Sequence, residues 1–421
     1  MGLPYDPASQ VTNILHQLTA SATQINQAAY AYNPVGNRTS LTDRRGPQAF
    51  GYDTLDRLTS ASHPLLATPQ AFAYDPVGNR AIGGSVVNAG NQLTADATHS
   101  YEYDDNGNLT RKTLLATGNY TQYTYDAENR LIKVEDFAAG NPTPVFRSTY
   151  RYDGLGRRIE KVANGQTKRH VYDGEDILLE YDGANILQAR YTHGPGIDEP
   201  IAVTKGGSTF FYHQDGLGTV TDLTDGAGAT AKSYAYDAYG NIVDQTGTVE
   251  QPYTYTGREF DSESGLYYYR ARNYDPATGR FLQKDPLGFM GKDVNLYRYV
   301  RSSPTNRADP SGLGPYSFVA CSILNAGKQF NDFLRELDFL DESTKMTREM
   351  LARIDSEISA CPARDVERLV ELKRIRDQLG LQLDELIMNR TADVTKLGLY
   401  QVAEGMVWEG ACGLALLLPL P

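Results

Sequence analysis

Residues 31–43 read AYNPVGNRTSLTD, and the chain returns to variants of this phrase six more times. The later copies begin at Gly51, Ala73, Glu102, Thr124, Arg151 and Ala235. Tyrosines at the same position of the first six copies lie 20 to 29 residues apart, at Tyr32, Tyr52, Tyr74, Tyr103, Tyr125 and Tyr152. A repeat of this length is typical of an architecture in which similar units stack or wind together.

Each copy has the composition of a strand, a tight turn and a second strand. The first strand alternates apolar and polar residues and usually ends in Tyr-Asp, as in TYDAENRLIKV from Thr124. Gly and Asn supply the left-handed backbone that a tight turn needs, and the Asp side chain can cap the turn. Tyr and β-branched residues favour the strands. The pattern predicts β-hairpins that pair into a long antiparallel sheet, with no long helix before about residue 320.

The overall composition excludes several classes of protein. The chain has 421 residues and a net charge of −12 at pH 7, which argues against nucleic acid as the main partner. Its mean hydropathy is −0.46, and it contains no run of eighteen apolar residues, so we predict no transmembrane segment. The opening MGLPYDPASQ lacks a basic and an apolar region, so we predict no signal peptide in this chain.

The polar residues of the repeats are expected to be structural. Their Tyr, Asp, Gly and Asn side chains suit turns and packing better than catalysis or sugar binding. The histidines are scattered through the repeats without metal-ligand spacing, at His16, His63, His99, His170, His193 and His213. We therefore predict neither a metal site nor a cofactor.

The Tyr-Asp phrase resembles the YD repeat of Rhs proteins, of the C components of insecticidal toxin complexes and of teneurins. Residues 251–313, from QPYTYTGREF to NRADPSGL, resemble the Rhs repeat-associated core, and repeats and core together cover about three quarters of the chain. The resemblance implies a sheet that spirals into a partial or complete β-shell around a C-terminal polypeptide. We expect a mainly β fold with repeats at 1–250, the core at 251–313 and a variable α-helical region at 314–421.

Two Asp-Pro-x-Gly elements stand out in the core-like stretch, beginning at Asp285 and Asp309. From spacing alone each is well explained as a turn, since Asp, Pro and Gly suit the first, second and fourth positions. Two carboxylates held close together offer a second explanation. They cannot both ionise cheaply, so one keeps its proton and the pair can act as acid and base on a peptide bond.

The resemblance implies that the corresponding aspartates serve self-cleavage directly after the leucine of the second element. On this chain the cleaved bond would join Leu313 to Gly314. A basic residue upstream is also implicated, for which Arg272 is the first candidate and Arg280 the second. Either could hold a carboxylate ionised or polarise the carbonyl group.

Residues 314–421 differ in composition from the rest. Apolar residues recur at helical spacing, as in 346–358 and 366–379, and the segment contains no histidine. Cys321, Cys361 and Cys412 match no zinc or redox motif, which favours buried thiols. In the family this segment is the variable payload, often a toxin. No nuclease, deaminase, hydrolase or phosphate-loop motif is present here, so its activity is unassigned.

The function expected from these features is that of an Rhs-repeat shell protein of the polymorphic toxin type. It would enclose its C-terminal effector and release it by aspartate-dependent cleavage after Leu313. The alternatives are a non-enzymatic cell-surface or adhesion-type repeat protein with an inactive tail, and an enzyme hidden in the tail. The expected partners are the chain's own tail in or against the shell, an immunity protein and a secretion apparatus. The resemblance implies a secreted or cell-surface protein.

Overall fold

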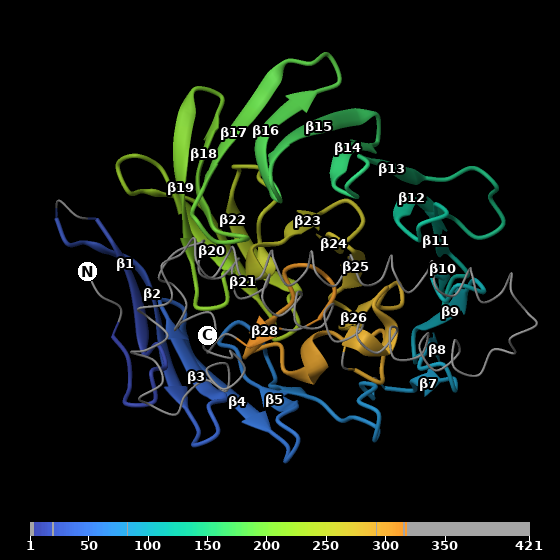
Figure 1. Ribbon diagram of the computed structural model, residues 1–421, viewed down its shortest axis with the longest axis horizontal. Helices are drawn as coiled ribbons and strands as arrows, with labels where there is room; N and C mark the ends of the chain where they lie inside the picture. The colour runs from blue at the N-terminus through green and yellow to red at the C-terminus, as the bar shows by residue number, and fades with distance from the viewer. Residues whose placement is uncertain (1–3, 19–20, 82, 292, 315, 318–421) are drawn as a thin grey trace, which may run out of the picture. The chain divides into compact units, whose positions relative to one another are not determined.

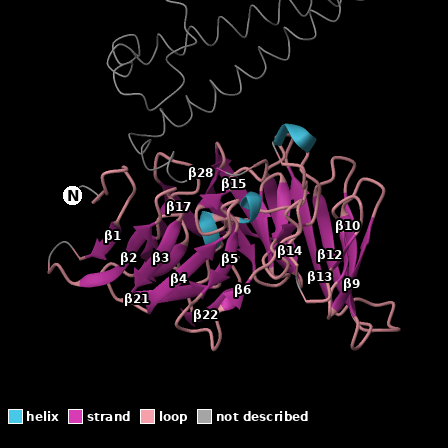
Figure 2. Ribbon diagram, turned by 90° about the horizontal axis from the view of Figure 1, so that it is seen from below, coloured by secondary structure: helices cyan, strands magenta, loops and turns pink. Residues whose placement is uncertain are grey.

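The computed structural model describes residues 4–18, 21–81, 83–291, 293–314 and 316–317 (Figure 1). All of them belong to the first of two compact units, Met1–Asn325 and Ala326–Pro421. The predicted C-terminal helices and the three cysteines lie outside the described residues. Figure 2 shows that strands dominate the described part, and the mainly β prediction is confirmed.

The strands form four antiparallel sheets in which neighbours follow the order of the chain. The six-stranded sheet contains β1 (Asn13–Gln17), β2 (Gln24–Tyr32), β3 (Arg38–Asp43), β4 (Gly46–Tyr52), β5 (Leu58–Ala61) and β6 (Gln70–Ala71). The sixteen-stranded sheet begins with β7 (Val86–Val87), β8 (Leu93–Ala95), β9 (His99–Tyr103), β10 (Leu109–Leu114), β11 (Tyr120–Tyr125), β12 (Leu131–Phe137), β13 (Phe146–Tyr152) and β14 (Arg158–Ala163). It continues through β15 (Gln166–Asp173), β16 (Asp176–Asp182), β17 (Leu187–His193), β18 (Pro200–Lys205), β19 (Ser208–Gln214), β20 (Val220–Thr224), β21 (Thr230–Tyr236) and β22 (Ile242–Gly247).

The core-like stretch carries the two smaller sheets. One contains β23 (Glu259–Asp261), β24 (Leu266–Tyr269), β25 (Arg272–Asp275) and β26 (Arg280–Phe281), and the other β27 (Arg307–Ala308) and β28 (Tyr316–Ser317). The short 3₁₀ helices of the described residues are η1 (Tyr255–Gly257), η2 (Gly288–Gly291) and η3 (Val300–Ser302). None of these helices is long or apolar enough to cross a bilayer.

The turns of the Tyr-Asp phrases are capped by their aspartates, as predicted, and Asn33 takes this role in the first phrase. In the β11–β12 hairpin, Oδ1 of Asp126 accepts hydrogen bonds from the backbone N–H groups of Glu128, at 2.9 Å, and Arg130, at 3.0 Å. Its Oδ2 accepts a bond from Nε of Arg130 at 2.7 Å. Asn129 supplies the left-handed backbone, with φ of 61°. The same backbone cap recurs at Asp53, Asp75, Asp153 and Asp182.

The tyrosine of each phrase joins its repeat to the one before it. The hydroxyl of Tyr125 donates a hydrogen bond to the carbonyl of Leu109, with the oxygens 2.7 Å apart. The equivalent bonds join Tyr52 to Arg38, Tyr74 to Leu58, Tyr152 to Leu131 and Tyr236 to Val220. The Arg130 guanidinium also lies 5.0 Å from the ring centroid of Tyr152 in the next repeat. In the Tyr-Asp phrase, the aspartate therefore stabilises the turn of its own hairpin and the tyrosine joins that hairpin to the preceding one.

The four-stranded sheet lies on the concave side of the long sheet, as Figure 1 shows. Its tyrosines make a buried aromatic cluster, in which Tyr267, Tyr269 and Tyr274 have no exposed surface. A buried ion cluster fastens it to the repeats, because Arg158 of β14 contacts Asp261 at 2.5 Å and Glu259 at 2.9 Å. The core-like stretch is thus held rigidly against the repeats.

The first and last repeat strands also meet, through side chains rather than a strand ladder. Asp222 of β20 accepts hydrogen bonds from Nδ2 of Asn26 and Nη2 of Arg44, both at 2.6 Å. Nearby, the rings of His16 and His213 lie edge to face with centroids 5.0 Å apart. We call this contact between β1–β3 and β19–β21 the polar seam. Such a contact depends on charge and hydrogen bonding, unlike a continuous sheet.

Candidate functional site

Three of the predicted site residues lie close together, although they belong to different parts of the core-like stretch. Arg272 opens β25, Asp285 follows β26, and Asp309 directly follows β27. Both Asp-Pro-x-Gly elements are turns, because the N–H of Gly288 donates to the Asp285 carbonyl at 2.9 Å and that of Gly312 to the Asp309 carbonyl at 3.2 Å. The turn hypothesis is therefore confirmed, and the two turns also lie side by side around one arginine.

Arg272 bridges the two carboxylates with a single nitrogen. Its Nη2 lies 3.2 Å from Oδ2 of Asp285 and 3.2 Å from Oδ2 of Asp309. The side chains of Arg272 and Asp309 are only 2% and 1% exposed. Nε of Arg272 donates to the carbonyl of Gly312 at 2.5 Å, and its guanidinium carbon lies 3.7 Å from the ring centroid of Phe281. The ring and the carbonyl fix the guanidinium in position between the acids.

The second candidate arginine lies elsewhere. Arg280 donates a hydrogen bond to Oδ1 of Asn79 at 2.9 Å and another to the carbonyl of Asn91. Both partners belong to the repeats, so Arg280 fastens the core-like stretch to them. The structure brings Arg272, and not Arg280, to the two aspartates.

The predicted scissile peptide lies directly against Asp309. Oδ1 of Asp309 accepts hydrogen bonds from the N–H groups of Leu313 and Gly314, each at 3.1 Å. Glycine is required at Gly312, where φ is 71° and a Cβ would stand 2.2 Å from the carbonyl oxygen of Tyr269. Gly314 also has a positive φ, of 147°. A tight turn therefore presents the 313–314 peptide to the Asp309 carboxylate.

Burial shifts the pKa values of Asp309, Asp285 and Arg272. It raises the pKa of Asp309 to about 6, although Arg272 and the N–H groups of Gly314 and Leu313 oppose the shift. Burial also raises the pKa of Asp285, again opposed by Arg272. The pKa of Arg272 is lowered by burial, which the two carboxylates counteract. A cluster of this kind can hold one proton between two acids near neutral pH.

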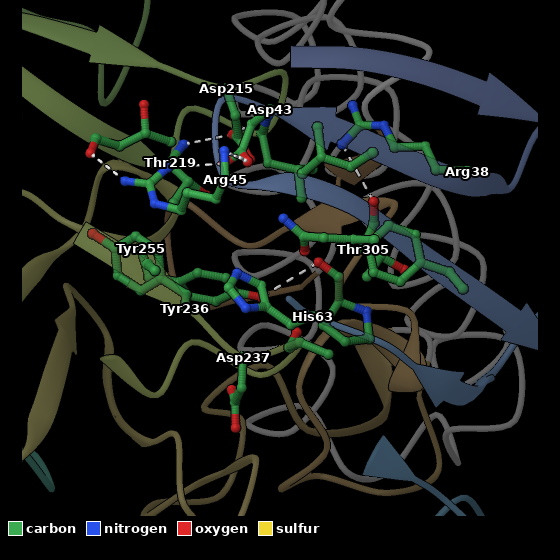
Figure 3. A pocket seen from close by; sticks show the side chains of 18 of the residues that line it. Arg38, Asp43, Arg45, His63, Asp215, Thr219, Tyr236, Asp237, Tyr255 and Thr305 are labelled. Atoms are coloured by element: carbon green, nitrogen blue, oxygen red, sulfur yellow. Dashed lines mark hydrogen bonds and ion pairs between the residues drawn. The ribbon is translucent and has the colours of Figure 1, made fainter. Parts of the chain in front are cut away.

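A separate cavity of about 80 Å³ lies between the six-stranded sheet and the last strands of the long sheet (Figure 3). Its charged lining is already engaged with protein groups. Nη1 of Arg45 pairs with Asp43 at 2.8 Å, and Nη2 of Arg38 donates to the carbonyl of Gly216 at 3.0 Å. Within the described ranges, no three His, Cys, Asp or Glu side chains gather as metal ligands would. This cavity adjoins the polar seam.

One residue near the scissile peptide was not predicted from the sequence. Gly291, the last residue of η2, lies so close to Asp285 that a Cβ there would stand 2.8 Å from its Oδ2. The available signal is a glycine outside both Asp-Pro-x-Gly elements in a stretch without a tight hairpin turn. That signal alone does not say which group approaches the glycine.

Comparison with known proteins shows which family this chain matches. A family model described as Teneurin YD-shell matches residues 37–305. The tRNA nuclease WapA of Bacillus subtilis (strain 168) is 31% identical over 319 residues, covering 68% of this chain and 13% of WapA. Toxin subunit YenC1 of Yersinia entomophaga is 28% identical over 413 residues, covering 78% of this chain and 40% of YenC1.

Solved structures agree on the fold. A structure of the Photorhabdus luminescens Tc holotoxin pore matches with a TM-score of 0.52 and 21% identity, covering 75% of this chain and 18% of that one. At this identity the match concerns the fold alone. The chain spans well under two thirds of the length of each of these relatives.

Proposed function

Because the chain belongs to the teneurin YD-shell family, we propose that it is an Rhs-type shell protein that cleaves itself between Leu313 and Gly314. The observation that carries the proposal is the position of this peptide against a buried acid pair. Asp309 accepts the Gly314 N–H at 3.1 Å, and Arg272 joins Asp309 to Asp285. Buried acids with raised pKa values beside a peptide bond are what acid–base hydrolysis by carboxyl groups uses.

In this proposal the repeats at 1–250 form the shell, the core at 251–313 carries the cleavage chemistry, and 314–421 is the released cargo. Relatives named as a tRNA nuclease and a toxin subunit support a protein of the polymorphic toxin type. The cargo is the shell's first partner, and an immunity protein and a secretion apparatus are the others. Expression of residues 314–421 in a bacterial host, with growth as the readout, tests whether the cargo is toxic.

The reaction begins with a water molecule that attacks the carbonyl carbon of Leu313. Ionised Asp309 accepts a proton from that water, while neutral Asp285 protonates the carbonyl oxygen. A new C–O bond forms, and the carbonyl carbon becomes tetrahedral. Arg272 and the N–H groups of Gly314 and Leu313 favour the ionised form of Asp309 and oppose the burial that raises its pKa. The mechanism requires the two carboxyl groups to share one proton at the start of the reaction.

The second step breaks the C–N bond between Leu313 and Gly314. Asp309 gives its proton to the Gly314 nitrogen, to which it is already hydrogen-bonded. Asp285 recovers its proton from the tetrahedral intermediate as the carbonyl group re-forms. The products are a chain ending in the Leu313 carboxyl group and a chain beginning with the Gly314 amine. Both aspartates return to their starting states, and one water is consumed.

The test is the mass of the purified full-length chain and its variants. The wild type is expected to give a fragment ending at Leu313, and Asp309→Asn and Asp285→Asn are expected to stay intact. Asp225→Asn is the matched control, because Asp225 also accepts two backbone N–H groups, from Ala227 and Ala229, in a turn of the repeats. Circular dichroism and thermal unfolding establish that each variant is folded.

Two outcomes contradict the proposal. If Asp309→Asn or Asp285→Asn is cut after Leu313 at the wild-type rate, the acid pair does not perform the cleavage. A wild-type chain that stays intact in the folded state would support the non-enzymatic alternative. Cleavage of the wild type and of Asp225→Asn, with both core variants intact, is the expected result.

A further inference from the structure

The backbone conformation at Gly291 does not require glycine. Its φ does not lie in the left-handed region, unlike that of Gly288 at the other end of η2, which has φ of 56°. An L-amino acid could therefore adopt the Gly291 conformation without backbone strain. If glycine is needed here, the reason is the space beside the Cα atom.

That space is taken by the two groups that meet in the proposed reaction. A Cβ on Gly291 would stand 2.8 Å from Oδ2 of Asp285 and 3.6 Å from the carbonyl oxygen of Leu313. On the other side of the scissile bond, a Cβ on Gly314 would stand 3.8 Å from the Gly291 carbonyl oxygen. Gly291 therefore borders both halves of the peptide that would be cut.

The Asp285 carboxyl group cannot easily retreat from an added methyl group. Its Oδ1 accepts a hydrogen bond from the N–H of Leu287 at 2.9 Å, and its Oδ2 lies 3.2 Å from Nη2 of Arg272. A Cβ 2.8 Å away would have to displace Oδ2 and lengthen its contact with the arginine. The substitution would therefore change the orientation of the Asp285 side chain and leave the surrounding fold unchanged.

We propose that Gly291 is a positioning residue for the self-cleavage, whose missing side chain lets the Asp285 carboxyl group stand beside the Leu313 carbonyl. This inference rests on the proposed function. It assigns the two acids to opposite sides of the scissile bond. Asp285 acts on the carbonyl side, beside Gly291, and Asp309 acts on the nitrogen side, where it accepts the Gly314 N–H.

The test compares cleavage rates of full-length chains that carry single glycine substitutions. Gly291→Ala is expected to slow the appearance of the fragment ending at Leu313 by about tenfold to a hundredfold, because a misplacement near 1 Å costs this much. Gly154→Ala is the matched control. Gly154 lies in a repeat turn without a left-handed φ, and a Cβ there would meet no atom within 4 Å. Its rate is expected to equal that of the wild type.

A pH–rate profile separates positioning from a general loss of structure. The charged groups that face Asp285 are Arg272 from β25, Asp309 from the second turn and Asp293 from the following loop. Displacing Asp285 from Arg272 removes the contact that favours its ionised form. Asp285 then keeps its proton to higher pH, so the high-pH limb of the profile moves upward in Gly291→Ala. A merely destabilised chain would lose rate without moving this limb.

All rates are measured at a temperature at which circular dichroism shows every variant to be folded. If wild type and Gly154→Ala are cut, Asp309→Asn is intact and Gly291→Ala is cut at the wild-type rate, this inference is overturned while the proposed function stands. A slower Gly291→Ala with an unmoved high-pH limb also overturns the positioning role. A wild-type chain that is never cut overturns both proposals.

Discussion

The backbone N–H of Gly314 donates a hydrogen bond to Oδ1 of Asp309, with the two atoms 3.1 Å apart. The nitrogen that would leave in peptide hydrolysis is therefore already in contact with the acid that would protonate it. No movement of the chain is needed to bring them together. This relationship, with the raised pKa of Asp309, leads to a first prediction about pH.

Cleavage should depend on pH with a bell-shaped profile. The pKa of Asp309 is about 6, so below that pH the group is protonated and cannot accept a proton from water. The rate should fall about tenfold for each pH unit below the pKa, and fall again at higher pH when the acid pair loses its remaining proton. The measurement is the first-order rate of fragment formation from pH about 4.5 to 9. A rate that does not change between pH about 4.5 and 7 would exclude Asp309 as the base.

Removing Arg272 should make the stability of the unit more sensitive to pH. Arg272→Met leaves two buried carboxyl groups without their cation, which costs about 3 kcal/mol or more at neutral pH. Their folded pKa values rise further above the unfolded value near 3.9, so stability is lost as pH rises through the raised values. The variant should therefore be less destabilised at pH about 5 than at pH about 7.5.

Urea unfolding at the two pH values measures this difference. The control is Arg151→Met, because the Arg151 side chain is 75% exposed and its contact with Glu160 is 3.6 Å long. An exposed pair of this kind contributes less than about 1 kcal/mol. Equal destabilisation of Arg272→Met at both pH values would contradict the prediction.

The tyrosine of the repeat phrase should contribute through its hydroxyl group. Tyr125→Phe removes the hydrogen bond to the Leu109 carbonyl and should lower the free energy of unfolding by about 1 kcal/mol. Tyr120→Phe is the control in the same strand, because the Tyr120 ring stacks on Phe137 at 4.8 Å, a contact that phenylalanine retains. Its effect should lie within about 0.5 kcal/mol. Equal losses in the two variants would show that the ring alone matters.

The polar seam should weaken in acid because two histidines face each other there. Burial and the nearby His16 lower the pKa of His213 to about 4. The unfolded value is about 6.5, so the unfolded chain binds more protons between the two values. The stabilisation is present above about pH 6.5 and is lost as pH falls toward 4. Because the ring is partly exposed, about 1–2 kcal/mol is expected.

His213→Gln should flatten this part of the stability profile. The measurement is urea unfolding of wild type and variant at pH about 7 and about 4.5. Glu180 and Asp261 have pKa values near 2, so their ionisation changes little over this range. A variant with the same pH dependence as the wild type would mean that other groups control the seam.

The hairpins were predictable because their signals are local. The spacing of Tyr32, Tyr52 and the later tyrosines, and the turn chemistry after each, specify strand–turn–strand without reference to distant residues. The meeting of the two sheet ends in the polar seam was not predictable in this way. It depends on side chains such as Asn26 and Asp222, which are 196 residues apart.

The candidate site could also be predicted only in part, because it depends on contacts between residues that are distant in sequence. The two matching elements suggested Asp285 and Asp309 as a pair, but each is also a good turn, and only family resemblance favoured the catalytic explanation. The choice between Arg272 and Arg280 could not be made from the sequence. Both arginines open buried strands of one sheet, and only their tertiary neighbours distinguish them. Gly291 was missed because its role depends on what approaches it in space.

The bond from each tyrosine to the preceding repeat has a consequence for how such proteins change in evolution. Every hairpin brings one donor for the unit before it and one carbonyl acceptor for the unit after it. Duplication or deletion of a whole unit therefore leaves matching tyrosine–carbonyl junctions on both sides. Recombination between repeats can therefore lengthen or shorten the repeat sheet while these junctions are kept.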